Sequence, residues 1–458
     1  MNAKHRPFLL YLPLFFGLQW FLVKSGLFQQ IFWLNQGQSI ALAILIIAAV
    51  LWITEWVPLY ITSFVILLLQ LIWLVPEIAP QGGAAVRMPY LAPFFNEIIL
   101  LFLGGFVLAA ALHKYGLDRK IASSLLKKTG NNPAKAMFGF MATSAFLSMW
   151  MSNTATTAMM FAILLPVVQK IPPENPFAKA LAISIPFSCN LGGLGTPIGT
   201  PPNAIAIAYL NSHGYHIGFA NWMLATLPFM LLFLVFLWLL LLKLFPAGNL
   251  VLELPEDQQK QMTLIQKTVA LIFFLTLVLW FGSDYLSLSI GTLSLVPIVV
   301  LFGAGILDLS DFKQLPWDVL FMVGGGICLG VGIQQSGLTD KIITLIPTHS
   351  QFWVILSLFA ILATIMTTFM SNTATANLLI PLAVSLDQNL GLLVIAIALN
   401  CSTAMSLPVS TPPNAIAFGS GMLASKDMLR PGIAITVFAL FTTLIAGALY
   451  WPLINLNP

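Results

Sequence analysis

Charged residues are scarce in this chain. Only 7% of its 458 residues are Asp, Glu, Lys or Arg, whereas 59% are hydrophobic. Soluble globular domains carry about 25% charged residues, so this composition excludes an ordinary water-soluble protein. Apolar stretches of about 20 residues, long enough for a helix to cross a bilayer, recur along nearly the whole sequence. We therefore expect an all-α polytopic membrane protein without a soluble domain.

Several functional signatures are also missing. Cys189, Cys328 and Cys401 lie in apolar stretches without CxxC spacing, which argues against a disulfide framework or a zinc site. There is no HExxH motif and no intramembrane Ser spaced for a helical pairing with Lys or His, so we expect neither an enzyme nor an organic cofactor. The 19 Lys and Arg residues are dispersed rather than gathered on one surface, which argues against nucleic acid as a partner.

Eleven apolar stretches predict membrane-spanning helices, with a retained N-terminal span because no small-residue cleavage site follows the first run. They lie near 8–28, 40–57, 60–76, 97–113, 177–210, 222–243, 266–283, 287–306, 316–334, 388–420 and 432–452. Two further stretches, about 136–172 and 350–386, are interrupted near the middle by Ser-Asn-Thr, and we interpret each as a re-entrant hairpin. Non-helical backbone at that depth has to be surrounded by protein or a cavity.

The distribution of basic residues predicts the orientation. With a cytoplasmic N-terminus, 16 Lys and Arg residues fall inside and only Lys24, Arg87 and Lys341 fall outside. If either hairpin were counted as a span, every later segment would have the opposite orientation and the excess of basic residues on the cytoplasmic side would be lost. We expect a protein of the plasma (inner) membrane with its N-terminus in the cytoplasm.

Three blocks recur in the same order. Residues 96–117 and 317–338 share an acid, two glycines and a terminal Gly-Leu at an offset of 221; SNTAT occurs at 152–156 and 371–375; TPPNAIA occurs at 200–206 and 411–417. Such matches indicate a duplication.

The duplication predicts the domain organisation. The predicted units are an N-terminal transmembrane helix (1–35), a first repeat (36–246), a cytoplasmic linker (247–265) and a second repeat (266–458). The odd number of crossings between corresponding elements implies that the repeats are inverted. Inverted repeats with helices broken near the midplane are the architecture of secondary transporters.

The interruptions have the chemistry of an ion-binding site. Ser-Asn-Thr residues favour helix starts, and a helix start offers free N–H groups to a carboxylate while the preceding helix end offers carbonyls to a cation. In the two broken helices, about 177–210 and 388–420, Gly or Ser followed by Thr-Pro-Pro ends one helix and begins another. The predicted substrate-binding residues are Ser152, Asn153, Thr154, Thr200, Pro201, Ser371, Asn372, Thr373, Thr411 and Pro412.

Sodium prefers hard oxygen ligands, and two such clusters are predicted. The first comprises Ser148, Ser152, Asn153 and Gly199, and the second comprises Thr367, Ser371, Asn372 and Ser410. No Lys or Arg lies within these motifs, so the charge of a bound anion would have to be balanced by helix ends and co-bound cations. Two similar anion-binding tips match a molecule with two carboxylates. Kinks or interhelical hydrogen bonds alone are the structural alternative.

These motifs resemble those of the divalent anion and sodium symporter family, in which paired Ser-Asn-Thr hairpins are combined with Thr-Pro-type unwound helices. The resemblance covers almost all of the chain. It implies a homodimer whose protomers combine a scaffold domain with a mobile transport domain, elevator-type alternating access, and sodium-coupled uptake of succinate, malate or fumarate. A sodium-independent exchanger, a sulfate or citrate carrier, and a channel are the alternatives.

Overall fold

The computed structural model describes residues 8–81, 83–172, 174–248, 250–252, 261–345, 352–384 and 390–454, and all regular structure within them is helical. The helices of the first half are α1 (Phe8–Lys24), α2 (Leu27–Phe32), α3 (Gln36–Thr54), α4 (Leu59–Leu69), α5 (Val75–Ile78), α6 (Ala84–Leu91), α7 (Glu97–Lys114), α8 (Leu117–Lys127), α9 (Pro133–Ser148), α10 (Asn153–Val168), α11 (Phe177–Gly192), α12 (Pro201–Ser212) and α13 (Phe219–Leu244).

The second half continues with α14 (Leu264–Phe281), α15 (Ser283–Leu286), α16 (Ile290–Gly303), α17 (Leu309–Lys313), α18 (Trp317–Gln335), α19 (Leu338–Leu345), α20 (Phe352–Phe369), α21 (Asn372–Val384), α22 (Leu390–Thr403), α23 (Pro412–Gly419) and α24 (Ser425–Leu449). Short π- or 3-10 segments η2 (Gln70–Leu74), η3 (Ala92–Phe95), η4 (Gly193–Gly195) and η5 (Trp451–Ile454) connect or extend them.

Polar side chains define where several of these helices begin. Asn35 and Thr263 form capping boxes with Gln38 and Gln266, at the starts of α3 and α14. Asn96 accepts a hydrogen bond from the backbone of the first turn of α7. Each cap satisfies an N–H group that has no partner inside the helix, so the apolar runs acquire defined ends from their own sequence.

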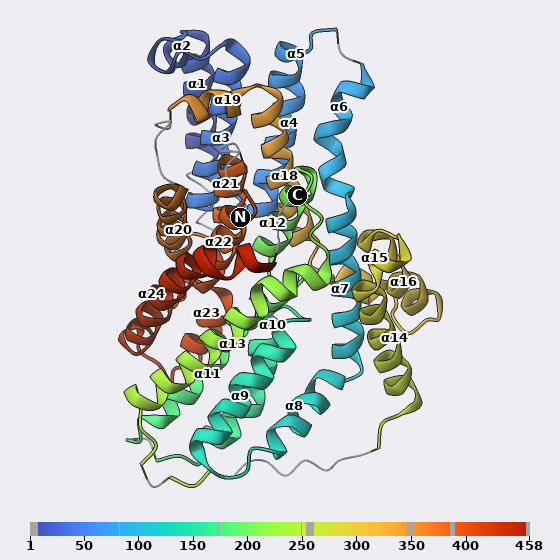
Figure 1. Cartoon of the computed structure of the whole chain (residues 1–458), viewed down its shortest axis with the longest axis vertical. Helices are drawn as coiled ribbons and strands as arrows, with labels where there is room; N and C mark the ends of the chain where they lie inside the picture. The colour runs from blue at the N-terminus through green and yellow to red at the C-terminus, as the bar shows by residue number, and fades with distance from the viewer. Residues whose placement is uncertain are drawn as a thin grey trace.

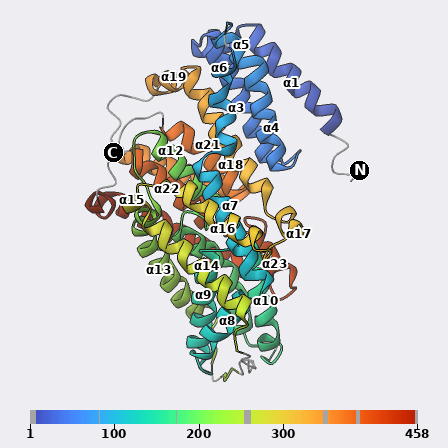
Figure 2. The ribbon, with the colours of Figure 1, turned by 90° about the vertical axis from the view of Figure 1, so that its right-hand side faces the viewer.

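The helices form two groups (Figure 1). Helices α1 to α6 and α19 make up the upper group. The lower group contains α12 and α20 to α22 at mid-height and α9 to α11, α13, α23 and α24 below them. Helix α7 runs between the groups, and α14 and α16 pack along it in both views (Figures 1 and 2). The two halves meet within the lower group, because α10 and α11 pack on α23 while α12 packs on α21 and α22.

Nine helices of the described residues are long and apolar enough to span a membrane: Gln36–Thr54, Leu59–Ile78, Ala84–Lys114, Phe177–Gly195, Phe219–Leu244, Leu264–Phe281, Trp317–Gln335, Phe352–Phe369 and Ser425–Leu449. Two of the eleven expected spans are shorter than predicted: α1 ends at Lys24, shortly before Gly26 at φ 71°, and the stretch near 287–306 contains only the 14-residue α16. The two stretches expected as broken helices, 177–210 and 388–420, are each divided, into α11 and α12 and into α22 and α23. The span expected at 97–113 corresponds to α7 (Glu97–Lys114), and α6 and η3 precede it in an apolar helical stretch that starts at Ala84.

The helices also break where the sequence is interrupted. Helix α9 ends at Ser148 and α10 begins at Asn153, while α20 ends at Phe369 and α21 begins at Asn372. Because Phe352–Phe369 is long enough to span by itself, length does not distinguish a re-entrant arm from a span, and the re-entrant course stays a prediction. The predicted linker 247–265 lies partly outside the described residues. Residues 350 and 386, which bound the second predicted hairpin, and residue 388, where the second broken helix is predicted to begin, also lie outside them.

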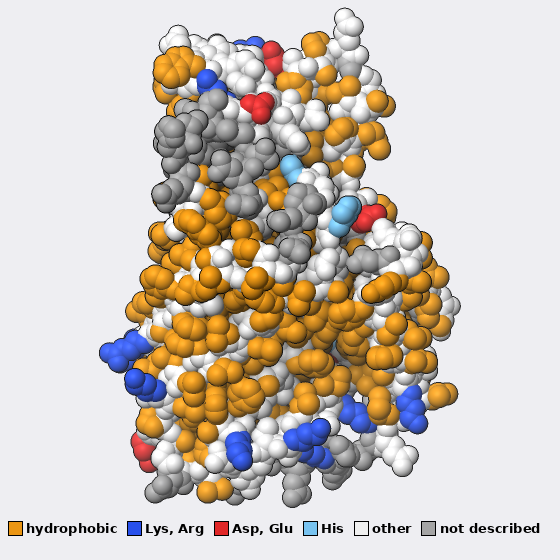
Figure 3. All heavy atoms as spheres, viewed as in Figure 1, with side chains coloured by type: hydrophobic (Ala, Val, Ile, Leu, Met, Phe, Trp, Pro, Cys, Tyr) orange, Lys and Arg blue, Asp and Glu red, His pale blue; other side chains and the backbone are white. Residues whose placement is uncertain are grey.

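The surface has the polarity of an integral membrane protein. A broad hydrophobic band covers the face shown in Figure 3, and Lys and Arg side chains gather along its lower rim. The lower ends of the helices in Figure 1 carry basic residues, among them Lys114 at the end of α7, Lys127 at the end of α8 and Lys135 near the start of α9. A lipid-facing band bordered by one basic rim fits the uneven distribution of charge along the sequence.

Candidate functional site

One cavity of about 640 Å³ brings the two halves of the chain together. Its wall contains both Ser-Asn-Thr tips and both Thr-Pro breaks. All ten residues predicted to bind substrate line it: Ser152, Asn153, Thr154, Thr200, Pro201, Ser371, Asn372, Thr373, Thr411 and Pro412. Of the predicted sodium ligands outside that set, Gly199 and Ser410 also line the cavity, whereas Ser148 and Thr367 lie behind it, fully buried.

The first tip is organised by side-chain hydrogen bonds. Ser152 caps α10 by accepting a hydrogen bond from the N–H of Ala155 at 3.4 Å. The hydroxyl of Ser148, at the end of α9, donates to Asn153 Oδ1 at 2.5 Å. The tip thus places a helix start, a hydroxyl and an amide oxygen next to one another.

The second tip has the same arrangement with a longer side chain. Ser371 accepts from the N–H of Ala374 at 3.1 Å. The Thr367 hydroxyl lies 2.7 Å from Asn372 Oδ1 and 2.7 Å from the carbonyl oxygen of Cys401. Thr367 therefore connects the tip to the end of α22, as well as to its own neighbour Asn372.

At the first break, two glycine backbones approach closely. A Cβ on Gly199 would lie 2.4 Å from the carbonyl oxygen of Gly193, and a Cβ on Gly193 would lie 3.0 Å from the side chain of Asn153. Asn203 closes the loop by donating to the carbonyls of Gly193 and Thr196, at 2.9 and 2.8 Å. Gly199 has no room for a side chain and Gly193 has very little, so the break can fold against the first tip, next to Asn153.

The second break is built in the same way with different side chains. Asn414 donates to the carbonyls of Met405 and Leu407, at 2.9 and 3.0 Å. The Ser410 hydroxyl donates to the carbonyl of Thr368 at 3.3 Å, which holds the break against the second tip. Ser410 therefore lies close to Thr367, its predicted partner in the second sodium site.

Apart from Glu55, the polar groups on the cavity wall are backbone atoms and neutral side chains. Among the described residues that line it, Glu55 is the one ionisable side chain and no basic residue occurs. Glu55 ends α3 in the left-handed region, with φ 49°, and its N–H bonds the carbonyl of Leu51. The described residues contain no cluster of three or more His, Cys, Asp or Glu that could hold a metal ion.

Sequence reasoning did not identify the rest of the wall. Phe102 and Phe106 of α7 and Met322 of α18 contribute apolar surface, and Asn190 of α11 contributes a polar amide. The apolar residues resemble any others in a hydrophobic helix, so nothing in the sequence marks them. Asn190 had a detectable signal, since a buried amide in an apolar segment has to find a hydrogen-bond partner.

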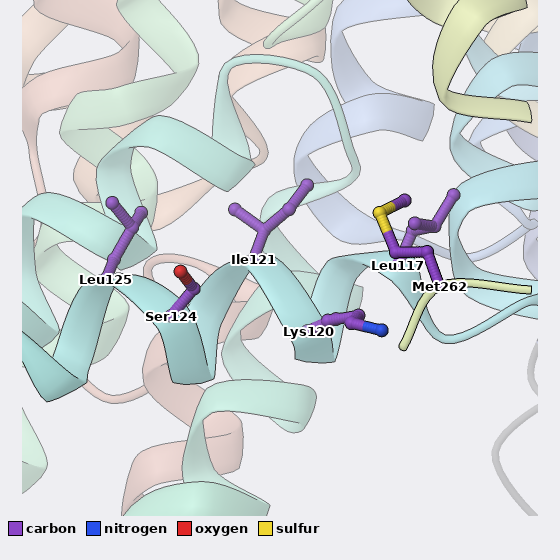
Figure 4. A pocket seen from close by; sticks show the side chains of 6 residues that line it. All are labelled: Leu117, Lys120, Ile121, Ser124, Leu125 and Met262. Atoms are coloured by element: carbon purple, nitrogen blue, oxygen red, sulfur yellow. The ribbon is translucent and has the colours of Figure 1, made fainter. Parts of the chain in front are cut away.

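A second hollow, of about 280 Å³, lies on the amphipathic helix α8. Figure 4 shows Leu117, Ile121 and Leu125 of α8, with Met262 beside Leu117. Its wall is mostly aliphatic and contains none of the predicted site residues, so it does not compete with the larger cavity as the functional site.

Comparison with known proteins agrees with this architecture. A family model described as "citrate transporter" matches residues 49–401. The sodium-dependent dicarboxylate transporter SdcS of Staphylococcus aureus is 32% identical over 455 residues, which cover 90% of this chain and 86% of that protein. SdcS of Staphylococcus saprophyticus is also 32% identical, over 87% of this chain and 83% of its own length.

Two further relatives are more distant in length or sequence. An uncharacterized transporter of Schizosaccharomyces pombe is 30% identical over 90% of this chain, which spans half the length of that relative. The crystal structure of the Alcanivorax borkumensis YdaH transporter superposes with a TM-score of 0.58 at 12% identity, covering 88% of this chain and all of the other. That structure supports the fold alone. The matches over most of the sequence show that this chain is a membrane transporter of the citrate transporter family.

Proposed function

We propose that the protein is a sodium-coupled symporter of C4-type dicarboxylates such as succinate, malate and fumarate. The observation that carries the proposal is the single cavity lined by two Ser-Asn-Thr helix starts and two Thr-Pro-Pro helix starts without a basic side chain among its described residues. Its volume of about 640 Å³ lies within the usual range of about 300–1,000 Å³ for small-molecule sites.

The four helix starts account for anion binding. Helices α10, α12, α21 and α23 begin at Asn153, Pro201, Asn372 and Pro412, all on the cavity wall. The first-turn N–H groups of a helix lack intrahelical acceptors and its N-terminus carries about half a positive charge. Helix starts from both halves suit an anion with a carboxylate at each end.

Sodium would complete the charge balance. Ser148 with Asn153 and Thr367 with Asn372 each combine a hydroxyl and an amide oxygen, and the glycine-rich break or Ser410 lies next to them. These are the hard, neutral oxygen atoms that alkali cations require. A dianion entering a cavity without Lys or Arg needs such cations nearby, which is a physical reason for coupling. The names of the SdcS relatives include the same sodium dependence.

The two helix groups suit an elevator movement. Contacts between the groups are concentrated on α18, which packs on both α12 and α21. Tyr209 of α12 donates to the carbonyl of Gly326, and Asn377 of α21 donates to the carbonyl of Met322. We propose that α9 to α13 and α20 to α24 form the transport domain, that the remaining helices form the scaffold, and that the halves are inverted repeats.

For the assembly and the orientation we keep what the sequence predicts. We propose a homodimer in the plasma (inner) membrane, with the N-terminus and the basic lower rim of Figure 3 on the cytoplasmic side. Cysteine-reactive labelling at introduced sites on α8 and α19, which lie at opposite ends of Figure 1, tests the orientation in intact cells.

Uptake of radiolabelled succinate into proteoliposomes tests the function. An inward sodium gradient should drive accumulation, whereas potassium should not. Uptake that needs internal dicarboxylate and ignores sodium would make the protein an exchanger and overturn the proposal.

Citrate is the second candidate substrate, because the matching family model bears its name. The same proteoliposomes distinguish the two, since competition by citrate and succinate for one labelled substrate ranks their affinities. Preferential inhibition by citrate would replace the C4 dicarboxylate with a tricarboxylate while leaving sodium coupling in place.

A further inference from the structure

The two breaks match in their helix boundaries and their Thr-Pro-Pro-Asn sequence but differ in side-chain hydrogen bonding. Adding 211 to the residue numbers of the first break gives those of the second, so Thr200 corresponds to Thr411 and Asn203 to Asn414. The helix boundaries keep this register, because Gly192 and Pro201 correspond to Thr403 and Pro412. Asn190 corresponds to Cys401, which breaks the symmetry.

Asn190 reaches from the first half to the second. It is only 2% exposed, it lines the cavity, and its Nδ2 lies 3.0 Å from Thr411 Oγ1 and 3.4 Å from Asn414 Oδ1. Its two N–H bonds can therefore serve one oxygen each. Helices α11 and α23, which carry these residues, pack directly on each other.

The direction of these hydrogen bonds is determined by their neighbours. The Asn414 amide nitrogen faces two carbonyl oxygens, so its Oδ1 has to point the other way, toward Asn190. An oxygen of Asn190 in that position would face another oxygen. Asn190 must consequently present its nitrogen and act as the donor to both Asn414 and Thr411.

This arrangement leaves the Thr411 hydroxyl able to donate a hydrogen bond but not to accept another. Its Oγ1 accepts from Asn190 Nδ2 and, at 3.3 Å, from the N–H of Asn414. A threonine oxygen has two lone pairs and one hydrogen, so both acceptor positions are filled. Among the hydrogen bonds of the described residues, the Thr411 hydroxyl donates none. Because Thr411 lies on the cavity wall, its hydroxyl can donate a hydrogen bond to an anion there.

The first half lacks this arrangement. Within the described part of the chain, Asn203 Oδ1 has no hydrogen-bond partner and the side chain of Thr200 makes no capping hydrogen bond. A cysteine at position 401 cannot provide the two strong N–H donors of an amide. The Thr200 hydroxyl therefore stays free to rotate and to act as either donor or acceptor.

We propose that Asn190 is a positioning residue that fixes the Thr411 hydroxyl as a donor to one anionic end of the substrate. The inference rests on the proposed function and adds that the two ends of the substrate site differ in their hydrogen bonding. The Thr411 end selects a group that can only accept hydrogen bonds, such as an ionised carboxylate. The Thr200 end has no such requirement, so the two ends of the dicarboxylate are held differently.

The test is a double-mutant cycle on Asn190 and Thr411 in proteoliposomes at saturating sodium. Asn190→Ala should raise the KM for succinate by about five- to tenfold, as expected when an oriented donor to a charged group is lost, while the maximal rate stays within about twofold. Thr411→Val should raise KM at least as much, and the double variant should be no worse than Thr411→Val, because Asn190 acts through Thr411.

Ser188→Ala is the matched control. Ser188 is a fully buried residue on the same helix, its hydroxyl has no hydrogen-bond partner among the described residues, and it does not line the cavity. Its KM should equal that of the wild type. Succinate-induced shifts of the thermal unfolding midpoint in detergent provide a readout besides transport, and they should be smaller in both Asn190→Ala and Thr411→Val.

The outcomes separate this inference from the proposed function. If the wild type shows no sodium-driven uptake of dicarboxylate, the proposed function fails and the inference fails with it. If the wild type transports and Thr411→Val raises KM while Asn190→Ala does not, or if the two effects add, only the positioning role is overturned. Should Asn190→Ala lose its unfolding transition, Asn190→Ser takes its place in the cycle, since its hydroxyl is one bond too short to reach Thr411.

Discussion

Thr367 offers a quantitative test of the second sodium site. Its hydroxyl is fully buried and lies 2.7 Å from both Asn372 Oδ1 and the Cys401 carbonyl oxygen. Thr367→Ala removes a proposed cation ligand and leaves one of these two acceptors without the hydrogen bond that the hydroxyl donates. An unsatisfied buried acceptor costs about 1–3 kcal/mol; if about 1–2 kcal/mol of this is expressed in cation binding, sodium affinity falls by roughly 5- to 30-fold.

The assay is initial succinate uptake in proteoliposomes as a function of external sodium. The half-saturating sodium concentration should increase in Thr367→Ala, and Thr367→Ser, which keeps the hydroxyl, should restore most of the affinity. A fluorescence-detected chromatogram and the unfolding midpoint establish that each variant is folded. An unchanged sodium midpoint in a folded Thr367→Ala protein would remove this residue from the ligand set and refute the reasoning.

Three further predictions concern the two tips, the first break and an ion pair at the end of α7. Asn153→Ala and Asn372→Ala should each abolish uptake while folded protein remains in the membrane; full transport in both would contradict the assigned site. Gly199→Ala would put a Cβ 2.4 Å from a backbone carbonyl oxygen, and overpacking of about 1–3 kcal/mol should lower the unfolding midpoint and weaken sodium binding together. Lys114, 3.0 Å from Asp308, lowers the pKa of that carboxyl. This contribution is present above the ordinary Asp pKa and disappears as the pH falls through the lowered one, so the difference in unfolding midpoint between the wild type and Lys114→Ala should shrink on acidification.

The break points of the helices could be predicted because their causes are local. Proline at 201 and 412 begins a helix but cannot continue one from the N-terminal side, and Ser152 and Ser371 cap the helices that follow them. These preferences act within one turn of backbone. The sequence therefore located four helix starts, and all four line one cavity.

Span lengths could not be predicted as well. The stretch 287–306 carries no charged residue and is predicted as one span, yet α16 contains only 14 residues and begins after the Ser289 cap. The predicted spans leave out the stretch 77–96, yet α6 and η3 form a helical course from Ala84 up to α7. The hydrophobicity of a segment indicates whether lipid or water surrounds it, but it does not indicate where the helix begins, ends or bends.

The sequence by itself determined that the chain is apolar and helical, that it contains matched blocks, and where its helices break, because hydrophobicity, proline geometry and capping act over a few residues. Only the tertiary structure decided which breaks face one another and which neutral side chains complete the wall. The contact between Asn190 and Thr411 joins residues 221 positions apart, and it exists because α11 packs on α23. No local preference encodes such a contact, since its energy depends on the packing of helices from both halves of the chain.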